Sequence, residues 1–115
     1  MEWIALESTD NKHYSVYVIE LSKAVLKEHK FLKRNPNYIP GKICCYVGYT
    51  GLDPKVRFAK HMANVKSNVY VQKYGLRLLP KLYQTFNPMT HDAAVAKEIS
   101  LGAVLQSLGF AVWQA

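Results

Sequence analysis

Arg57 and His61 are four residues apart in a segment that begins at Pro54 and has the pattern of a helix. With about 100° of rotation per residue, the two side chains project from one face. That face also carries Lys60 and Asn64, and the opposite one carries Val56, Ala59, Met62 and Ala63. A guanidinium can hold a phosphate through two hydrogen bonds, and an imidazole can donate to a phosphate or move a proton. Pairs at this spacing are also common on ordinary exposed helix faces, so the spacing alone favours that interpretation.

A carboxylate, Glu98, interrupts the apolar stripe of a second expected helix at residues 91–108. The rest of the stripe consists of Ala94, Leu101, Leu105 and Leu108. Because burying an unpaired carboxylate is costly, Glu98 is expected to have a partner. The partner is either a buried Lys or Arg, which would be a structural role, or a hard cation such as Mg²⁺, which prefers carboxylate oxygen. The sequence leaves both alternatives open.

Two tyrosines, Tyr17 and Tyr46, lie in apolar segments that have the composition of strands. A phenol hydroxyl can donate or accept a proton in catalysis. Tyrosine is also a common strand residue, and this chain has eight of them. By composition alone, the two positions therefore indicate strands and no chemistry.

The elements that must position these residues follow from periodicity and turn signals. Residues 14–21 are rich in β-branched and aromatic side chains on both faces, which predicts a central strand. A second strand is expected at 43–48, a partly extended segment with a break at Pro80 at 76–86, and a short last strand at 110–113. The order predicts a small α/β domain in which helices flank a central three-stranded, mainly antiparallel sheet.

Capping residues set the limits of the two main helices. Asp53 is a favourable N-cap and Pro54 suits the first helical position, so a helix is expected over 54–66. After a turn at Asn87-Pro88, Thr90 can cap the helix over 91–108. Its first turn contains the acid Asp92, and Gly109 stands just beyond its end.

The charge of the chain is strongly positive, since 15 Lys and Arg oppose 8 Asp and Glu for a net charge of +7. Such an excess attracts polyanions, of which nucleic acid is the usual one and an anionic membrane surface the other. Much of it falls in residues 22–42, where a short helix near residues 24–26 is followed by a loop. The basic residues of this segment are Lys23, Lys27, Lys30, Lys33, Arg34 and Lys42. It is either a solvated surface or an arm that touches phosphates.

Length and cysteine usage restrict the class of protein. A chain of 115 residues, half of them hydrophobic, is expected to form one compact domain spanning residues 1–115. Cys44 and Cys45 are adjacent, so on a strand they point to opposite faces and are unsuited to a shared metal or a disulfide. Residues 1–10 lack the pattern of a secretory signal, and no apolar run has membrane-spanning length. A cytoplasmic protein without a membrane partner is expected.

These residues together resemble the GIY-YIG nuclease family over residues 14–113. The matching elements, in chain order, are Ser15-Val16-Tyr17, Tyr46-Val47-Gly48, Tyr49-Thr50, Arg57, His61 and Glu98. Ser15 replaces the first glycine of the family, and the wider spacing between the two tyrosines makes 22–42 a basic insertion. The family often has an asparagine after the glutamate helix, where this chain has only Gln114 nearby. These elements in the family order are together far more specific than one tripeptide.

The resemblance implies a metal-dependent endonuclease that hydrolyses phosphodiesters, with DNA as the expected nucleic acid. It implies that Glu98 holds one Mg²⁺ or Mn²⁺ and that Tyr17 is, or helps to form, the general base, which requires nearby positive charge to lower its pKa. Arg57 would neutralise developing charge, and Tyr46 and His61 would position water or share the proton. The expected nucleic-acid contacts are Lys30, Lys33, Arg34, Lys60, Lys66 and Lys73.

Two other functions fit the same sequence. One is a catalytically inactive nucleic-acid-binding module on the same scaffold. The other is a basic protein-interaction domain that uses an aromatic patch around Trp3, Tyr83 and Phe86. Since the chain has no separate recognition domain, weak sequence specificity, a homodimer or a partner protein is expected to supply the choice of substrate.

Overall fold

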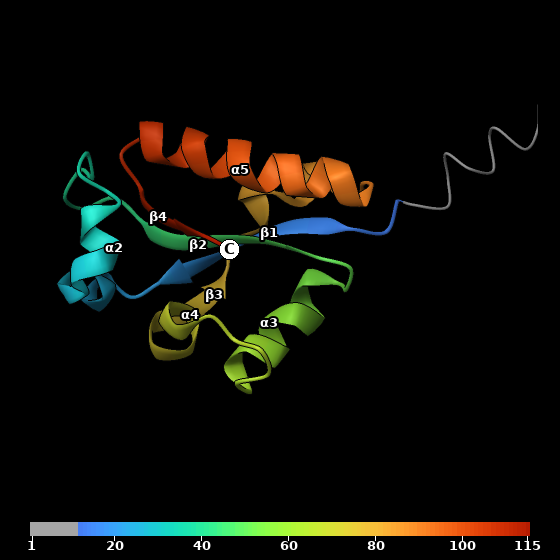
Figure 1. The fold of residues 1–115 in the computed structure, drawn as a ribbon, viewed down its shortest axis with the longest axis horizontal. Helices are drawn as coiled ribbons and strands as arrows, with labels where there is room; N and C mark the ends of the chain where they lie inside the picture. Colours follow the sequence, from blue (N-terminus) through green and yellow to red (C-terminus); the bar gives the residue numbers. More distant parts are fainter. Residues whose placement is uncertain (1–11) are drawn as a thin grey trace, which may run out of the picture.

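A computed structural model of the chain describes residues 12–115 (Figure 1). Four strands form one sheet in the order β3-β1-β2-β4. Their bounds are β1 Ser15–Leu21, β2 Cys44–Thr50, β3 Gly75–Leu78 and β4 Ala111–Gln114. β1 pairs antiparallel with β2 and with β3, whereas β2 pairs parallel with β4. The expected α/β class is confirmed, and β1 is a central strand, but the sheet is mixed and has four strands where three were expected.

The helices form a layer on each side of this sheet. Figure 1 shows α5 along one face, α3 and α4 on the other, and α2 beside the β4 edge. The α-helices are α2 His29–Lys33, α3 Pro54–Met62, α4 Val69–Tyr74 and α5 His91–Ser107. Short 3₁₀ helices are η1 Lys23–Lys27, η2 Pro80–Leu82 and η3 Gln84–Phe86. Among residues 12–115, no helix combines the length and the apolar character needed to cross a membrane.

The caps expected from the sequence are in place. The Thr90 side chain accepts a hydrogen bond from the Ala93 amide, and α5 ends within one residue of its expected limit. Asp53 caps α3 by accepting from the Lys55 amide. The expectation that α3 continues to residue 66 is wrong, because Asn64 and Lys66 adopt positive φ angles of 63° and 49°. A right-handed helix cannot pass through such residues.

The basic insertion at 22–42 is docked on the domain rather than extended as a free arm. It contains two short helices, η1 and α2, in place of the single one expected. Each helix buries one apolar side chain, Val25 and Phe31. The Tyr74 hydroxyl of α4 also donates to Glu28 Oε2 at 2.5 Å. The insertion therefore has a fixed place beside α4 and β4.

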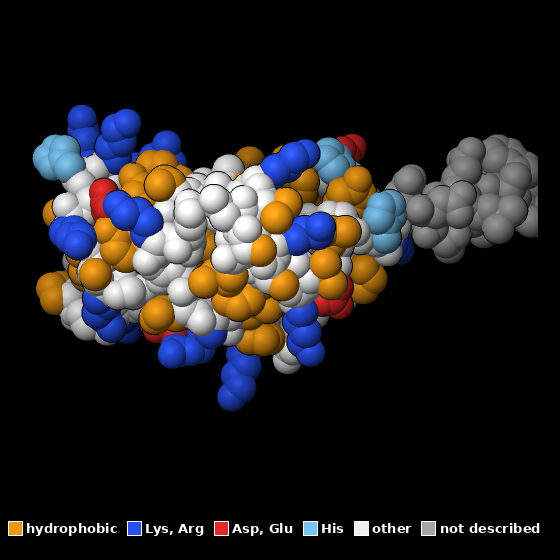
Figure 2. Space-filling model, turned by 90° about the horizontal axis from the view of Figure 1, so that it is seen from below, with side chains coloured by type: hydrophobic (Ala, Val, Ile, Leu, Met, Phe, Trp, Pro, Cys, Tyr) orange, Lys and Arg blue, Asp and Glu red, His pale blue; other side chains and the backbone are white. Residues whose placement is uncertain are grey.

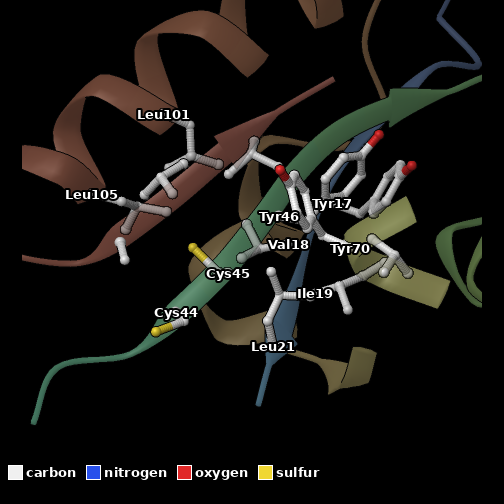
Figure 3. Packing of buried hydrophobic residues seen from close by; sticks show 14 of the residues in the cluster. Tyr17, Val18, Ile19, Leu21, Cys44, Cys45, Tyr46, Tyr70, Leu101 and Leu105 are labelled. Atoms are coloured by element: carbon white, nitrogen blue, oxygen red, sulfur yellow. The ribbon is translucent and has the colours of Figure 1, made fainter. Parts of the chain in front are cut away.

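The core lies on both faces of the central strands. Figure 3 shows Leu101 and Leu105 of α5 pointing toward the sheet, where Val18 and Cys45 lie. Cys44 and Cys45 are buried and free, as expected from adjacent strand positions. Alternation along β1 and β2 then leaves Tyr17 and Tyr46 on the face toward α3 and α4.

Two asparagine side chains provide hydrogen bonds to strand residues that have no neighbouring strand on one side. Because β3 pairs only with the later part of β1, the backbone of Val16 has no strand beside it, and Asn87 pairs with both its N–H and its C=O at 2.9 Å. Asn35, which is 4% exposed, pairs in the same way with Val112 of β4, at 2.7 and 3.1 Å. These bonds satisfy strand-edge groups and fix β1 just before Tyr17.

Candidate active site

Tyr17, Tyr46 and His61 meet on the α3 side of the sheet. The hydroxyl of Tyr17 lies 2.9 Å from His61 Nε2. The ring centroid of Tyr46 is 6.2 Å from that of Tyr17 and 5.5 Å from that of His61. Figure 3 shows the two tyrosines projecting from adjacent strands. Three residues selected from separate parts of the sequence thus form one buried cluster.

Gly48 makes this close approach possible. It pairs with Tyr17 across the two central strands, on the same face as Tyr46. A Cβ atom at position 48 would lie 2.7 Å from the Tyr17 hydroxyl oxygen and 3.1 Å from Tyr46 Cε2. The first distance is too short for a real contact, so any larger residue would displace the tyrosine hydroxyl. The glycine of the second motif is therefore required by packing in the cluster.

His61 is fully buried, and this corrects the interpretation of α3 as a helix with an exposed polar face. The helix turns His61 toward the sheet, while Val56 and Met62 on the opposite side are 47% and 46% exposed. Burial, together with the positive charge of Arg57, lowers the pKa of His61 to about 4. His61 is consequently neutral at physiological pH and can accept a proton through one nitrogen.

The contacts of the second nitrogen of His61 favour one tautomer. His61 Nδ1 lies 3.4 Å from Ser67 Oγ, and Ser67 Oγ donates its own proton to the Asn68 carbonyl at 3.1 Å. Since the serine proton is already used, its oxygen accepts from an Nδ1–H group. His61 Nε2 is then unprotonated, and the Tyr17 hydroxyl donates to it. This chain of three groups gives the Tyr17 proton a defined acceptor.

Arg57 holds the loop that carries Ser67. Its guanidinium donates to the carbonyls of Val65 and Lys66 at 3.2 and 2.9 Å. Burial raises the pKa of Tyr17 and of Tyr46, and the positive charge of Arg57 only partly offsets this rise. Arg57 therefore belongs to the cluster electrostatically, while two of its donors bind the backbone that follows α3.

Glu98 lies on α5, which covers the face of the sheet opposite to α3. Its side chain is 5% exposed, and within residues 12–115 its Oε2 atom has no hydrogen-bond partner. Burial raises the pKa of the Glu98 carboxyl, and a hydrogen bond from the Ala115 backbone partly offsets this. Its charge contributes to raising the pKa of both Tyr17 and Tyr46, which places it in Coulombic range of them. Of the two partners left open by the sequence, no Lys or Arg in the described part of the chain pairs with it.

The pKa of Tyr17 differs from what a phenolate base would need. Burial, followed by the neighbouring Tyr46, raises the pKa of Tyr17 far above its ordinary value, and the lowering by Arg57 does not compensate. Tyr17 is thus a neutral phenol in the free protein. In the free protein, the charge of Arg57 by itself does not lower the pKa of Tyr17 below its ordinary value.

No protein-family model, curated protein or solved structure matches this chain. The resemblance to GIY-YIG nucleases thus depends on the sequence motifs alone.

The basic residues expected to bind nucleic acid are distributed over several surfaces. Figure 2, which views the side of α3 and α4, shows Lys and Arg side chains scattered among apolar ones. Those with exposed positions include Lys30, Lys33, Lys60 and Lys66. Lys73 forms an ion pair with Glu28 at 3.3 Å, and Arg34 lies over the ring of Trp113. Because these residues belong to different elements, only some of these cations can contact one substrate.

The aromatic patch expected for a protein-interaction domain is not formed as a surface by the described residues. Tyr83 is buried at 4% exposure, whereas Phe86 is 40% exposed and has Lys97 Nζ 4.3 Å from its ring centroid. Trp3, the third residue of that patch, lies outside the described residues. Leu108, expected in the buried stripe of α5, is 54% exposed because the helix ends there.

Periodicity and composition do not indicate the contacts of four residues in or near the site, which are Ser67, Gly48, Gly102 and Gln114. Ser67 lies just beyond the expected end of the helix over 54–66, and Gly48 belongs to the second motif. Gly102 of α5 leaves room for Gln114, because a Cβ atom at position 102 would lie 1.9 Å from Gln114 Nε2. Gln114 in turn donates to the Ile99 carbonyl, next to Glu98. All four depend on contacts between distant segments, which periodicity does not show.

Proposed function

We propose that this protein is a metal-dependent endonuclease that hydrolyses phosphodiester bonds of nucleic acid, with DNA as the expected substrate. The observation that carries the proposal is a Tyr17–His61 proton pair within Coulombic range of Glu98, a buried carboxylate with an unpartnered oxygen. A purely structural role does not account for that oxygen, because an unpaired buried carboxylate destabilises the fold. Proteins retain such groups where they bind or react.

The Glu98 carboxylate fits one hard divalent cation, Mg²⁺ or Mn²⁺. Among residues 12–115, no group of three His, Cys, Asp or Glu side chains gathers at one place. A single protein ligand suits Mg²⁺, which keeps several waters and binds substrate phosphates. When bound, the cation would polarise the phosphodiester and stabilise the leaving oxygen. Glu98 would hold it, and the remaining ligands would come from water and substrate.

The arrangement of Tyr17 and His61 supports a coupled proton transfer. The Tyr17 hydroxyl oxygen can accept a proton from the attacking water while its own proton passes to His61 Nε2. Tyr17 stays neutral throughout, so the step avoids the phenolate that its raised pKa disfavours. The negative phosphate of a substrate would raise the pKa of His61 toward its ordinary value and make it a better acceptor.

Arg57 would donate hydrogen bonds to the substrate phosphate. A guanidinium has five N–H donors, and the carbonyls of Val65 and Lys66 use two of them. The remaining donors could stabilise charge that develops on the phosphate. Its partly exposed position at the cluster is compatible with both tasks.

Cleavage of supercoiled plasmid tests the proposal. Purified protein is incubated with plasmid in Mg²⁺, in Mn²⁺ and in EDTA, beside the Glu98→Ala variant. Nicking or linearisation that requires both metal and Glu98 is the expected result. Equal cutting by the variant would reject the assignment of Glu98.

A complete absence of cutting on plasmid, branched DNA and RNA would favour the second candidate, a nucleic-acid-binding module without catalysis. The raised pKa of Tyr17 and the engaged guanidinium of Arg57 are the observations that fit that candidate.

Ser67 offers a test of the proton path. In Ser67→Ala, Nδ1 of His61 loses its acceptor, so the Nε2-protonated tautomer becomes competitive and the Tyr17 hydroxyl loses its acceptor in turn. We expect kcat to fall about tenfold, since positioned proton transfer contributes about a hundredfold or more in total. Ser67→Thr, which keeps the hydroxyl, should retain most of the activity. Nitrogen NMR shifts of His61 report the tautomer directly, and an unchanged tautomer in Ser67→Ala would contradict the assignment.

The basic insertion should contribute to the salt dependence of binding. Neutralising Lys30, Lys33 and Arg34 together is expected to reduce the slope of log K against log salt by up to about three, because each phosphate that the protein neutralises adds about 0.9 to that slope. The measurement is a titration of labelled DNA at several salt concentrations in EDTA. The control variant neutralises Lys73, which is already paired with Glu28 and should matter less. An unchanged slope in the triple variant would show that the insertion faces away from the substrate.

A further inference from the structure

A groove runs along the outer side of β4, between α2 and α5. It consists of two adjoining hollows of about 310 and 230 Å³ that share Arg34 and Gln106 as lining residues. The first is also lined by Asn37, Tyr38 and Phe110, and the second by Val112 and Gln114. Volumes of this size are in the lower range of small-ligand sites. The groove is distinct from the cluster around Tyr17.

The groove presents a planar cation and amide groups. The Arg34 guanidinium lies 3.8 Å from the ring centroid of Trp113. No acidic side chain of the described residues forms an ion pair with Arg34. Gln106 Nε2 donates to the Arg34 carbonyl and to Asn35 Oδ1, which fixes the backbone beneath the guanidinium. A flat cation beside amide side chains matches a nucleobase, which offers a π face for stacking and polar edges for hydrogen bonds.

The far end of the groove leads toward Glu98. Gln114, which lines the second hollow, packs against Gly102 of α5 and donates to the Ile99 carbonyl. Ile99 follows Glu98 in the chain, so the Gln114 amide at the end of β4 lies beside the turn of α5 that carries Glu98. The second hollow therefore lies next to the segment that carries the carboxylate that we assign to the metal.

We propose that this groove binds an unpaired nucleotide of the substrate strand close to the scissile phosphate, with its base stacked on Arg34. The inference rests on the proposed function, because it names a substrate feature of the same site. It also predicts that single-stranded or locally opened nucleic acid is bound better than closed duplex, since a paired base cannot enter the groove.

Binding of a labelled oligonucleotide in EDTA tests the groove without cleavage. Fluorescence anisotropy compares wild type with Arg34→Ala, Arg34→Lys and the matched control Lys33→Ala. Lys33, the last residue of α2, carries the same charge next to Arg34 in the chain but does not line either hollow. Because Arg34→Ala removes the stacking partner of one base, it should weaken single-strand binding about tenfold. Lys33→Ala should weaken it about twofold, and Arg34→Lys should restore little, because an ammonium is not planar.

Each outcome has a separate meaning. Equal losses of affinity for Arg34→Ala and Lys33→Ala, or full recovery of affinity with Arg34→Lys, would show that Arg34 contributes only its charge. Either result would overturn the groove proposal. The same holds if Arg34→Ala weakens closed duplex as much as single strands. Wild-type protein that binds no nucleic acid would instead overturn the proposed function. Thermal melting checks that Arg34→Ala, in which the packing on Trp113 is removed, is folded under the assay conditions.

Discussion

Tyr17→Phe should lower kcat for phosphodiester cleavage by about a hundredfold or more, with substrate affinity and fold retained. The variant removes only the hydroxyl that lies 2.9 Å from His61 Nε2. The phenyl ring still fills the same buried position, so the core is little disturbed. Because the hydroxyl is the group that can take a proton from water, its loss affects the reaction and not the binding of phosphate.

Tyr83→Phe is the matched control for Tyr17→Phe. Tyr83 is also buried, at 4% exposure, but it lies outside the cluster and its hydroxyl has no hydrogen bond among the described residues. It should leave kcat unchanged. Single-turnover kinetics separate the chemical step from product release. If Tyr17→Phe cleaves at the wild-type rate, a water molecule or His61 takes the proton without Tyr17, and the proposed path is wrong.

The pH dependence follows from His61. Protonated His61 cannot accept the Tyr17 proton, so kcat/KM should fall as the pH approaches about 4, the pKa of His61 in the free protein. The same shift affects stability. Since the folded pKa lies below the unfolded value of about 6.5, the unfolded chain binds more protons between them. The contribution of His61 to stability is complete above about pH 6.5 and is lost as the pH falls toward 4. Urea unfolding of wild type and His61→Gln across this range measures it.

Glu98→Gln should abolish metal-dependent cleavage, with a loss of about a thousandfold or more, and should stabilise the protein without metal. A bound cation supplies several kcal/mol of charge stabilisation, and a factor of ten in rate corresponds to about 1.4 kcal/mol. In the absence of metal, the unpartnered Oε2 atom is a cost to the fold. We expect the substitution to raise Tm by about 4 °C or more, which corresponds to about 1 kcal/mol.

The size of this stability gain depends on pH and on metal. Burial raises the pKa of Glu98, so its carboxyl is least costly below its unfolded pKa of about 4.3, where it is protonated. That advantage is lost as the pH rises through the folded pKa. The gain from Glu98→Gln should therefore be largest at neutral pH and vanish in acid. Mg²⁺ should raise the Tm of wild type and leave that of Glu98→Gln unchanged.

Glu20→Gln provides the matched control. Glu20 pairs with Arg77 on β3, so its loss should leave stability unchanged or slightly lower it, with the Mg²⁺ response intact. Differential scanning fluorimetry with and without Mg²⁺ measures all three proteins. A Glu98→Gln variant that is less stable than wild type at neutral pH would show that the carboxylate has a partner. That result would remove the observation on which the metal assignment depends.

The sequence by itself determined most of the elements and selected the residues of the cluster. Local signals carried these predictions. Thr90 and Gly109 bound α5, Asp53 starts α3, and the β-branched run of β1 has the composition of a central strand. Glu98 could be recognised because a carboxylate is anomalous in an apolar stripe, whatever that stripe packs against.

Only the tertiary structure decided how the residues of the cluster are used. The apolar side of α3 points outward and His61 points inward, which reverses the usual rule for an amphipathic helix, since the sheet beside it presents two tyrosine hydroxyls. The end of α3 depends on two left-handed residues, and the carbonyls of the loop bind Arg57. The pKa values of Tyr17 and His61 depend on burial by segments far away in the chain. These properties arise from contacts between strands, helices and loops, and a one-dimensional pattern records only which residues are available to make them.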